Sequence, residues 1–100
     1  RDSYAAQLRR RFTWLPEALA RRYVRTYGTR AEQLIGTAQS LEDLGEHFGH
    51  HLYEAELRYL VAEEWVVELD DAIWRRTKLG MWLDDAQKQR VAQWLAEHKS

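Results

Sequence analysis

The chain has 100 residues, of which 45% are hydrophobic and 12% aromatic, so it is long enough for one domain with a substantial core. Its 15 basic and 16 acidic side chains leave a net charge of −1, which provides no long-range field to attract nucleic acid or an anionic membrane. The absence of cysteine excludes disulfides, thiolate metal sites and thiol nucleophiles. No apolar run approaches the roughly 20 residues of a membrane span, and no signal-peptide pattern opens the sequence. Because it opens on Arg1 rather than Met, we expect a fragment of a longer protein.

Helix-forming residues dominate the sequence, and strand signals are weak. We therefore predict an all-α fold, a compact bundle of five or six short helices packed orthogonally, which forms one domain over residues 1–100. The first helix is expected over residues 3–12, with Ser3 or Asp2 as its N-terminal cap.

The second helix is expected to begin at Pro16, whose missing N–H suits a first turn, and to stop at Gly28 in a left-handed cap. Thr29 then caps a third helix over residues 30–39. Helical spacing places these apolar side chains of the first three helices toward the core: Tyr4, Leu8, Phe12, Leu19, Ala20, Tyr23, Val24, Tyr27, Leu34, Ile35 and Ala38.

In the second half of the chain, we predict a short turn over residues 40–43 and a loop over 44–51. A helix over 53–64, a corner at 65–67 and another helix over 68–76 follow, and a link over 78–82 leads to the last helix. Asp84 caps the last helix, and Gln87 three residues later completes a capping box. The expected buried side chains of these helices are Leu57, Leu60, Val61, Ala86, Val91, Trp94 and Leu95.

Three histidines, His47, His50 and His51, lie in one short segment among carboxylates, and imidazole with carboxylate is a donor set that Zn²⁺ accepts. Gly49 between them argues against a rigid helix that would bring His47 and His51 to one face. We therefore interpret the segment as a polar loop and predict no metal site. A metal- or pH-responsive domain built on these histidines remains an alternative hypothesis.

Three basic clusters stand out in the sequence: Arg9 to Arg11, Arg21 with Arg22 and Arg25, and Arg75 with Arg76 and Lys78. Such clusters are usually solvated faces, but arginine can also pair with a carboxylate or phosphate on a partner. The last cluster follows Ile73 and Trp74, and interfaces often combine Trp with Arg in this way.

Neither catalysis nor DNA binding is predicted. Adjacent acids such as Asp70 and Asp71 lie about 100° apart on a helix and do not face each other. The sequence has no defensible Ser-His-Asp spacing and no glycine-rich phosphate loop. The two helices around the corner at 65–67 could imitate a helix-turn-helix, but the second begins with acids that would repel DNA phosphates.

Residues 53–65 and 69–80 resemble the C-terminal domain of FAD-dependent glycerol-3-phosphate dehydrogenases and the related α-glycerophosphate oxidases. The residues that fit the family pattern are Glu56, Arg58, Tyr59, Asp71, Arg75, Arg76 and Thr77. The resemblance extends over essentially the whole chain, and the Trp-Leu-Asp-Asp run at 82–85 is typical of the bacterial respiratory branch.

This resemblance implies a parent flavoenzyme that oxidises sn-glycerol 3-phosphate to dihydroxyacetone phosphate and passes electrons to quinone. The FAD-binding part, with its Gly-x-Gly-x-x-Gly fingerprint, belongs to the rest of the parent, and this chain has no such motif. We therefore expect no cofactor, no catalytic residue and no activity in the fragment alone.

The partner implied by the resemblance is the FAD/substrate domain of the same parent chain, on which this domain would pack as a helical cap. The candidate contact residues are Arg58, Arg75, Arg76 and Lys78. The arginines at 75 and 76 could instead form internal ion pairs with Glu56 or Glu63, and both alternatives stay open. The parent could also be a homodimer.

The resemblance further implies a cytoplasmic location, with the parent peripheral on the cytoplasmic side of the inner membrane and this domain reaching the membrane through the parent only. No nucleic-acid partner is expected. The alternative function is a free-standing helical protein-interaction module without an enzyme parent.

Overall fold

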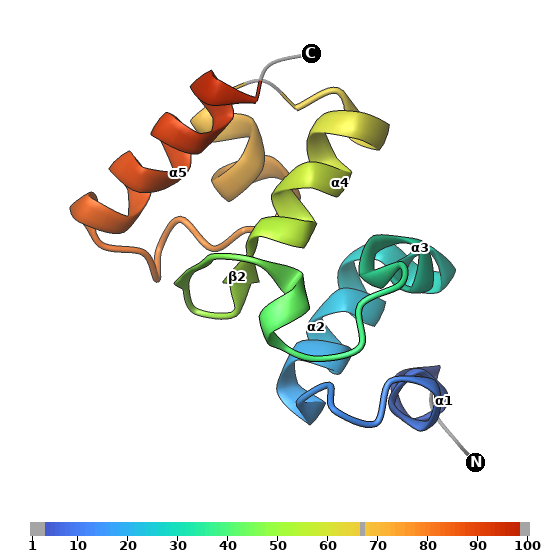
Figure 1. Cartoon of the computed structure of the whole chain (residues 1–100). Helices are drawn as coiled ribbons and strands as arrows, with labels where there is room; N and C mark the ends of the chain where they lie inside the picture. Colours follow the sequence, from blue (N-terminus) through green and yellow to red (C-terminus); the bar gives the residue numbers. More distant parts are fainter. Residues whose placement is uncertain (1–3, 67, 99–100) are drawn as a thin grey trace. The chain divides into compact units, whose positions relative to one another are not determined.

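The computed structural model describes residues 4–66 and 68–98 of the chain. Its helices are α1 (Tyr4–Arg11), α2 (Glu17–Tyr27), η1 (Gly28–Arg30), α3 (Ala31–Ile35), η2 (Glu42–Leu44), α4 (Glu54–Glu64), η3 (Asp71–Arg76) and α5 (Asp85–Glu97). The strands β1 (His47–Gly49) and β2 (Leu52–Tyr53) form the one small sheet of the described residues (Figure 1). The predicted all-α class is confirmed.

The chain divides into two compact units, Arg1–Gly45 and Glu46–Ser100, which we describe separately. The prediction that residues 1–100 form one domain stays a prediction. No helix of the described segments is both long and apolar enough to cross a membrane.

The first unit is built on the contacts that α2 makes with α1 and α3. Apolar residues at helical spacing put one face of each helix into a shared core, whose fully buried members include Leu8, Leu15, Leu19 and Tyr23. Burial of a side chain of this size stabilises a fold by roughly 1.5–3 kcal/mol, so these few residues carry much of the unit's stability.

Several predictions for the first unit are corrected at the ends of helices. The chain leaves α3 at Gly36, where φ is 64°, so the predicted helix 30–39 is too long and Ala38 lies outside it, half-buried. The Thr29 cap is also wrong, because Thr29 lies inside η1 and the N-cap of α3 is Arg30. Helix α2 begins one residue after Pro16 and ends at Gly28 with positive φ but with ψ outside the left-handed region. The predicted caps Ser3 and Asp2 lie outside the described residues.

One side chain of the predicted basic clusters is not on a solvated face. Arg22 is 7% exposed, and its guanidinium lies over the ring of Tyr23, 5.2 Å from the ring centroid. A planar guanidinium can be buried against an aromatic face in this way, which a hydrophobic periodicity does not reveal.

Two predicted core positions of the first unit, Tyr4 and Val24, are only half-buried.

The second unit packs the β1–β2 hairpin between two long helices, with β2 contacting α4 and β1 contacting α5. Its core includes Phe48, Leu52, Leu57, Leu60, Ile73, Val91, Trp94 and Leu95. The predicted capping box at the start of α5 is confirmed, with Gln87 N–H donating to Asp84 Oδ1 at 2.7 Å and Asp84 N–H donating to Gln87 Oε1 at 2.9 Å.

The segment 44–51, predicted to be a loop, is where the sequence was most misleading. It holds β1 and a two-residue turn in which both His50 and His51 have positive φ, at 46° and 68°. Two-residue hairpin turns favour positive φ at both central residues, usually with Asn-Gly rather than two histidines. The hairpin pairs His47 with Tyr53 and Gly49 with Leu52, with an irregularity between the two pairs.

The predicted helix 68–76 forms, but its residues Asp71–Arg76 adopt a π-helix rather than an α-helix. Thr77 N–H accordingly donates to Ala72 O at 2.9 Å, across five residues. Trp65 has left-handed geometry and ends α4, in agreement with a corner there, and Val67 of that corner lies outside the described residues. Val61 is half-buried and Ala86 is exposed, so the predicted burial of Ala86 is wrong.

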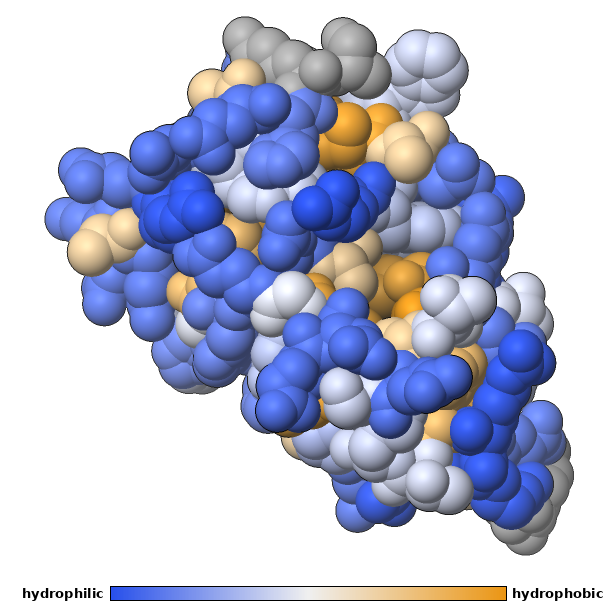
Figure 2. Space-filling view, in the orientation of Figure 1, coloured by the Kyte–Doolittle hydropathy of each residue, from blue (hydrophilic) through white to orange (hydrophobic). Residues whose placement is uncertain are grey.

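The face seen in Figure 2 is mostly hydrophilic, with apolar residues appearing in small patches between hydrophilic ones. This agrees with the 31% of charged residues in the sequence.

Candidate functional site

A carboxylate at the first residue of α4 connects three parts of the second unit. Glu54 accepts hydrogen bonds from Trp94 Nε1 of α5 at 3.0 Å, from Arg58 Nη2 at 2.7 Å and from the backbone N–H of Glu46 at 3.2 Å. The hydrogen bond from Trp94 is the main reason that the pKa of Glu54 lies below its ordinary value, and the bonds from Glu46 and Arg58 act in the same direction while burial opposes them. The charged form of Glu54 is therefore the one that the fold stabilises.

A second carboxylate fixes the approach of α5 to the hairpin. Glu46 and Arg90 form a two-pronged ion pair, with Nε to Oε2 at 2.8 Å and Nη2 to Oε1 at 2.6 Å. The guanidinium also lies over the ring of Phe48, 5.7 Å from its centroid. This fork geometry sets orientation as well as distance, so the pair determines how α5 lies on β1.

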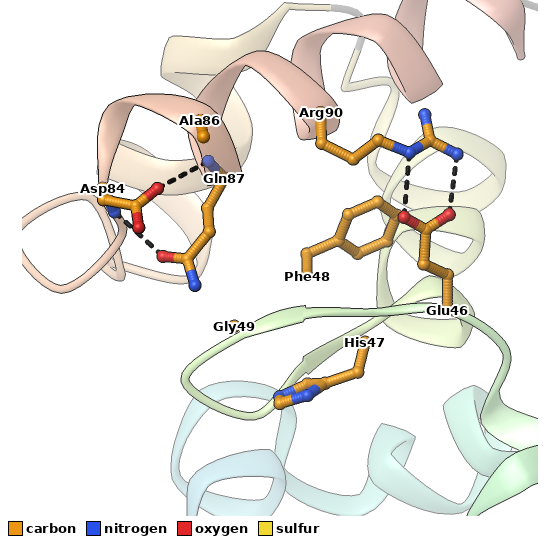
Figure 3. A pocket seen from close by; sticks show the side chains of 8 residues that line it. All are labelled: Glu46, His47, Phe48, Gly49, Asp84, Ala86, Gln87 and Arg90. Carbon is orange, nitrogen blue, oxygen red and sulfur yellow. Dashed lines mark hydrogen bonds and ion pairs between the residues drawn. The ribbon is translucent and has the colours of Figure 1, made fainter.

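A pocket of about 340 Å³ opens beside this ion pair, between the hairpin and the start of α5 (Figure 3). Its lining residues are Glu46, His47, Phe48, Gly49, Asp84, Ala86, Gln87 and Arg90. Glu46 is paired with Arg90, and Asp84 is paired with Gln87, while Arg90 Nη1 is buried without a hydrogen-bond partner. The two pairs in the lining of the pocket therefore connect the start of α5 internally and α5 to the segment before β1.

A second hollow, of about 290 Å³, lies beside α4 and α5 and is lined by Arg58, Val61, Ala62, Trp94 and His98. The His98 ring stacks on Trp94 at a centroid distance of 3.9 Å, and its Nδ1 lies 2.8 Å from Trp94 O. The Arg58 guanidinium lies over the same indole, 5.8 Å from the ring centroid. Arg58 thus has an internal role, packing on Trp94 and pairing with Glu54.

The three candidate histidines do not converge on one point. His47 stacks on Tyr53, and its Nε2 accepts the backbone N–H of His51 at 3.3 Å, while the ring of His50 lies near Trp82. In the segments that the structure describes, no group of three or more His, Cys, Asp or Glu side chains is arranged to hold a metal ion.

In the basic cluster at 75–78, Arg76 forms a close ion pair, whereas Arg75 and Lys78 are mostly exposed to solvent. Arg76 pairs with Glu64 near the end of α4, whereas Arg75 reaches only Asp71, at 3.8 Å, with its side chain 81% exposed. Lys78 is exposed, has positive φ and makes no ion pair with any described residue. The two arginines thus pair with Asp71 and Glu64, which the sequence analysis did not propose as their partners.

Sequence reasoning noted Glu46 and Glu54 only as carboxylates near the histidines, did not single out Arg90, and assigned Trp94 only to the core. Glu54 and Trp94 are 40 positions apart, and Glu46 and Arg90 are 44 apart. No local pattern marks such pairs, although an acid at the first turn of a predicted helix was visible at Glu54.

The chain belongs to the family described as the C-terminal domain of alpha-glycerophosphate oxidase, which it matches over residues 1–100. It is 61% identical over 98 residues to the aerobic glycerol-3-phosphate dehydrogenase of Escherichia coli, and the match covers 98% of this chain. It is 43% identical to a glycerol-3-phosphate dehydrogenase of Pseudomonas aeruginosa, over 97% of the chain. It is 41% identical to the D-erythritol 1-phosphate dehydrogenase of Brucella abortus, over 93% of the chain.

The chain spans about a fifth of the length of these curated relatives: 20% of the Escherichia coli protein, 19% of the Pseudomonas aeruginosa protein and 18% of the Brucella abortus protein. The family resemblance stated from residues 53–80 is thereby confirmed.

Proposed function

We propose that this chain is the C-terminal helical domain of an FAD-dependent glycerol-3-phosphate dehydrogenase. The parent oxidises sn-glycerol 3-phosphate to dihydroxyacetone phosphate and passes the electrons to quinone. The observation that carries this proposal is the 61% identity, over 98 residues, to the aerobic glycerol-3-phosphate dehydrogenase of Escherichia coli. The alternative of a free-standing interaction module is not favoured by this match.

Within such a parent, the domain acts as an accessory cap on the part that holds FAD and substrate. The sequence has no Gly-x-Gly-x-x-Gly fingerprint for the dinucleotide part of FAD. The flavin therefore resides in the rest of the parent, and so does any contact with the membrane, on the cytoplasmic side of the inner membrane. A homodimer of the parent is part of the same proposal.

Of the four candidate contact residues, Arg75 and Lys78 fit a role between domains best. Arg75 is exposed and only loosely paired, and Lys78 has no ion-pair partner among the described residues, so both can meet carboxylates of a partner surface. Arg58 and Arg76 are engaged with Glu54 and Glu64 and fit an internal role.

The experiment compares three proteins: the full-length parent, the parent without the segment matching residues 1–100, and this chain alone. We expect flavin absorbance and glycerol-3-phosphate–dependent dye reduction in the full-length parent and neither in the chain alone. The shortened parent should keep flavin if it folds, because the FAD site lies outside this chain. Flavin binding or dye reduction by the chain alone would contradict the proposal, as would a full-length parent that is inactive on glycerol 3-phosphate.

A further inference from the structure

Several large apolar side chains of the second unit are left in solvent. Trp74 is 47% exposed, Met81 is 80% exposed and Trp82 is 61% exposed. Trp74 comes from the π-helix η3, and the other two come from the turn that follows it. We call these three residues, together with Gly80 and Lys88, the Trp74 patch. Exposed apolar groups gathered on one segment mark an interaction surface more often than scattered ones do.

The indole of Trp74 is held in place although it is half exposed. It lies against Gly80, so closely that a Cβ atom added there would come within 2.5 Å of the ring. Gly80 does not have positive φ, so glycine is needed at this position for space rather than for backbone conformation. Lys88 Nζ of α5 lies over the same ring, 5.6 Å from its centroid.

The backbone around Gly80 is equally well fixed. Gly80 N–H donates to Ile73 O at 3.0 Å, which ties the turn to the π-helix. Thr77 is buried, and its Oγ1 accepts the N–H of Leu79 at 3.3 Å. A large aromatic side chain that is already ordered before binding loses little conformational entropy on docking, which is the property of an interface anchor.

We propose that the Trp74 patch is the surface through which this domain docks onto the catalytic part of its own parent chain. This inference rests on the proposed function, which supplies that parent. Lys88 lies over the ring of Trp74 within the patch, so the facing surface should be apolar with a carboxylate placed to meet this cation.

The exposed area of the Trp74 patch favours a partner surface in the same parent chain over a second copy. Three side chains of these types at these exposures offer roughly 400 Å², about half of the ~800 Å² that each partner contributes to a stable complex. A tethered domain needs less, because the linker holds the two surfaces at an effective concentration in the millimolar range. The relatives are about five times as long as this chain, so a parent of that length would supply such a tethered surface.

Charge argues against a lipid surface as the occupant. Residues 68–88 hold five acids and four bases, so the segment as a whole gains little from anionic lipids. The acids are Glu68, Asp70, Asp71, Asp84 and Asp85.

The experiment is hydroxyl-radical footprinting of the full-length parent, read by mass spectrometry at Met81 and Trp74. Each oxidation rate is divided by the rate of the same residue in urea-denatured protein. We expect several-fold protection of Met81, although its side chain is 80% exposed in the isolated domain. Protection should not change on dilution or on addition of phosphatidylglycerol vesicles.

The proposal is overturned if Met81 oxidises in the native parent as fast as in the denatured one. It is also overturned if protection disappears on dilution, which indicates a second copy, or appears only with vesicles, which indicates lipid. Dye reduction with glycerol 3-phosphate, measured on the same sample, reports on the proposed function separately.

Two variants of the full-length parent sharpen the test. Gly80→Ala keeps Trp74 but forces its ring off the glycine, and Trp74→Ala removes the ring, so both should reduce the protection of Met81 several-fold. Trp65→Ala is the matched control, because Trp65 is 83% exposed and lies outside the patch. Thermal melting verifies that each variant is folded, and unchanged Met81 protection in both folded Trp74-patch variants would overturn the proposal.

Discussion

At the residue scale, one carboxylate joins three parts of the second unit. Glu54 receives hydrogen bonds from α5, from its own helix and from the backbone before β1. Its side chain is 20% exposed, so solvent screens these interactions only in part. A single carboxylate thus links the start of α4 to both of its neighbours.

The stability of the chain should therefore fall on acidification through Glu54. Because the folded-state pKa lies below the ordinary value of 4.5, the contribution is fully present above pH 4.5 and is lost as the pH falls through the folded pKa. Glu54→Gln should lower the free energy of unfolding at pH 7 by roughly 1–3 kcal/mol and flatten its pH dependence in the acid range. Urea denaturation of the chain between pH 7 and pH 3 measures both effects.

Trp94→Phe serves as the comparison for Glu54, since it removes the largest cause of the lowered pKa and keeps an aromatic ring. It should show part of the same loss and part of the same flattening. If the free energy of unfolding of Glu54→Gln falls with pH as steeply as that of the wild type, the pH dependence arises from other carboxylates.

At the element scale, one local structure could be predicted from the sequence, and two others could not. The capping box at Asp84 depends on two side chains three residues apart and was visible in the sequence. The hairpin at 47–53 was missed because its turn uses two histidines at positive φ, where Asn-Gly is the usual signal. The π-helix η3 was read as an ordinary helix, since both conformations accept the same residues.

Asp84→Ala should destabilise the chain by about 1 kcal/mol, because it leaves the N–H of Gln87 without its cap. Asp85→Ala is the control: it removes a neighbouring exposed acid in the first turn of α5 and should have a smaller effect, about 0.3–1 kcal/mol. Chemical denaturation of both variants gives the comparison. Equal losses would mean that charge near the helix end, and not the capping hydrogen bond, stabilises α5.

At the scale of the whole molecule, the names of the relatives bear on whether this domain selects the substrate of its parent. Proteins named for glycerol 3-phosphate and for D-erythritol 1-phosphate both match this chain, at 61% and 41% identity. Under the proposed function, a domain shared between two polyol phosphate dehydrogenases supports the flavoenzyme without selecting its substrate. The selecting residues should then lie in the rest of each parent.

A domain exchange tests this directly. Replacing the matching segment of the Brucella abortus enzyme by this chain should leave its relative activity on D-erythritol 1-phosphate and glycerol 3-phosphate unchanged in dye-reduction assays. The ratio of kcat/KM for the two substrates is the measure, because it is independent of how much enzyme folds. A chimera whose preference moves toward glycerol 3-phosphate would show that this domain reaches the substrate site.

The sequence by itself determined the all-α class, the positions of α2, α4 and α5, the capping box and the family. These features depend on residues a few positions apart, or on a long run of matching residues, and both are present in the sequence alone. The tertiary structure decided the Glu54–Trp94 and Glu46–Arg90 pairs, the burial of Arg22 and the contact of Trp74 with Gly80. These contacts arise only when elements pack, because side chains 40 or more positions apart, or across a turn, meet through the geometry of the folded backbone.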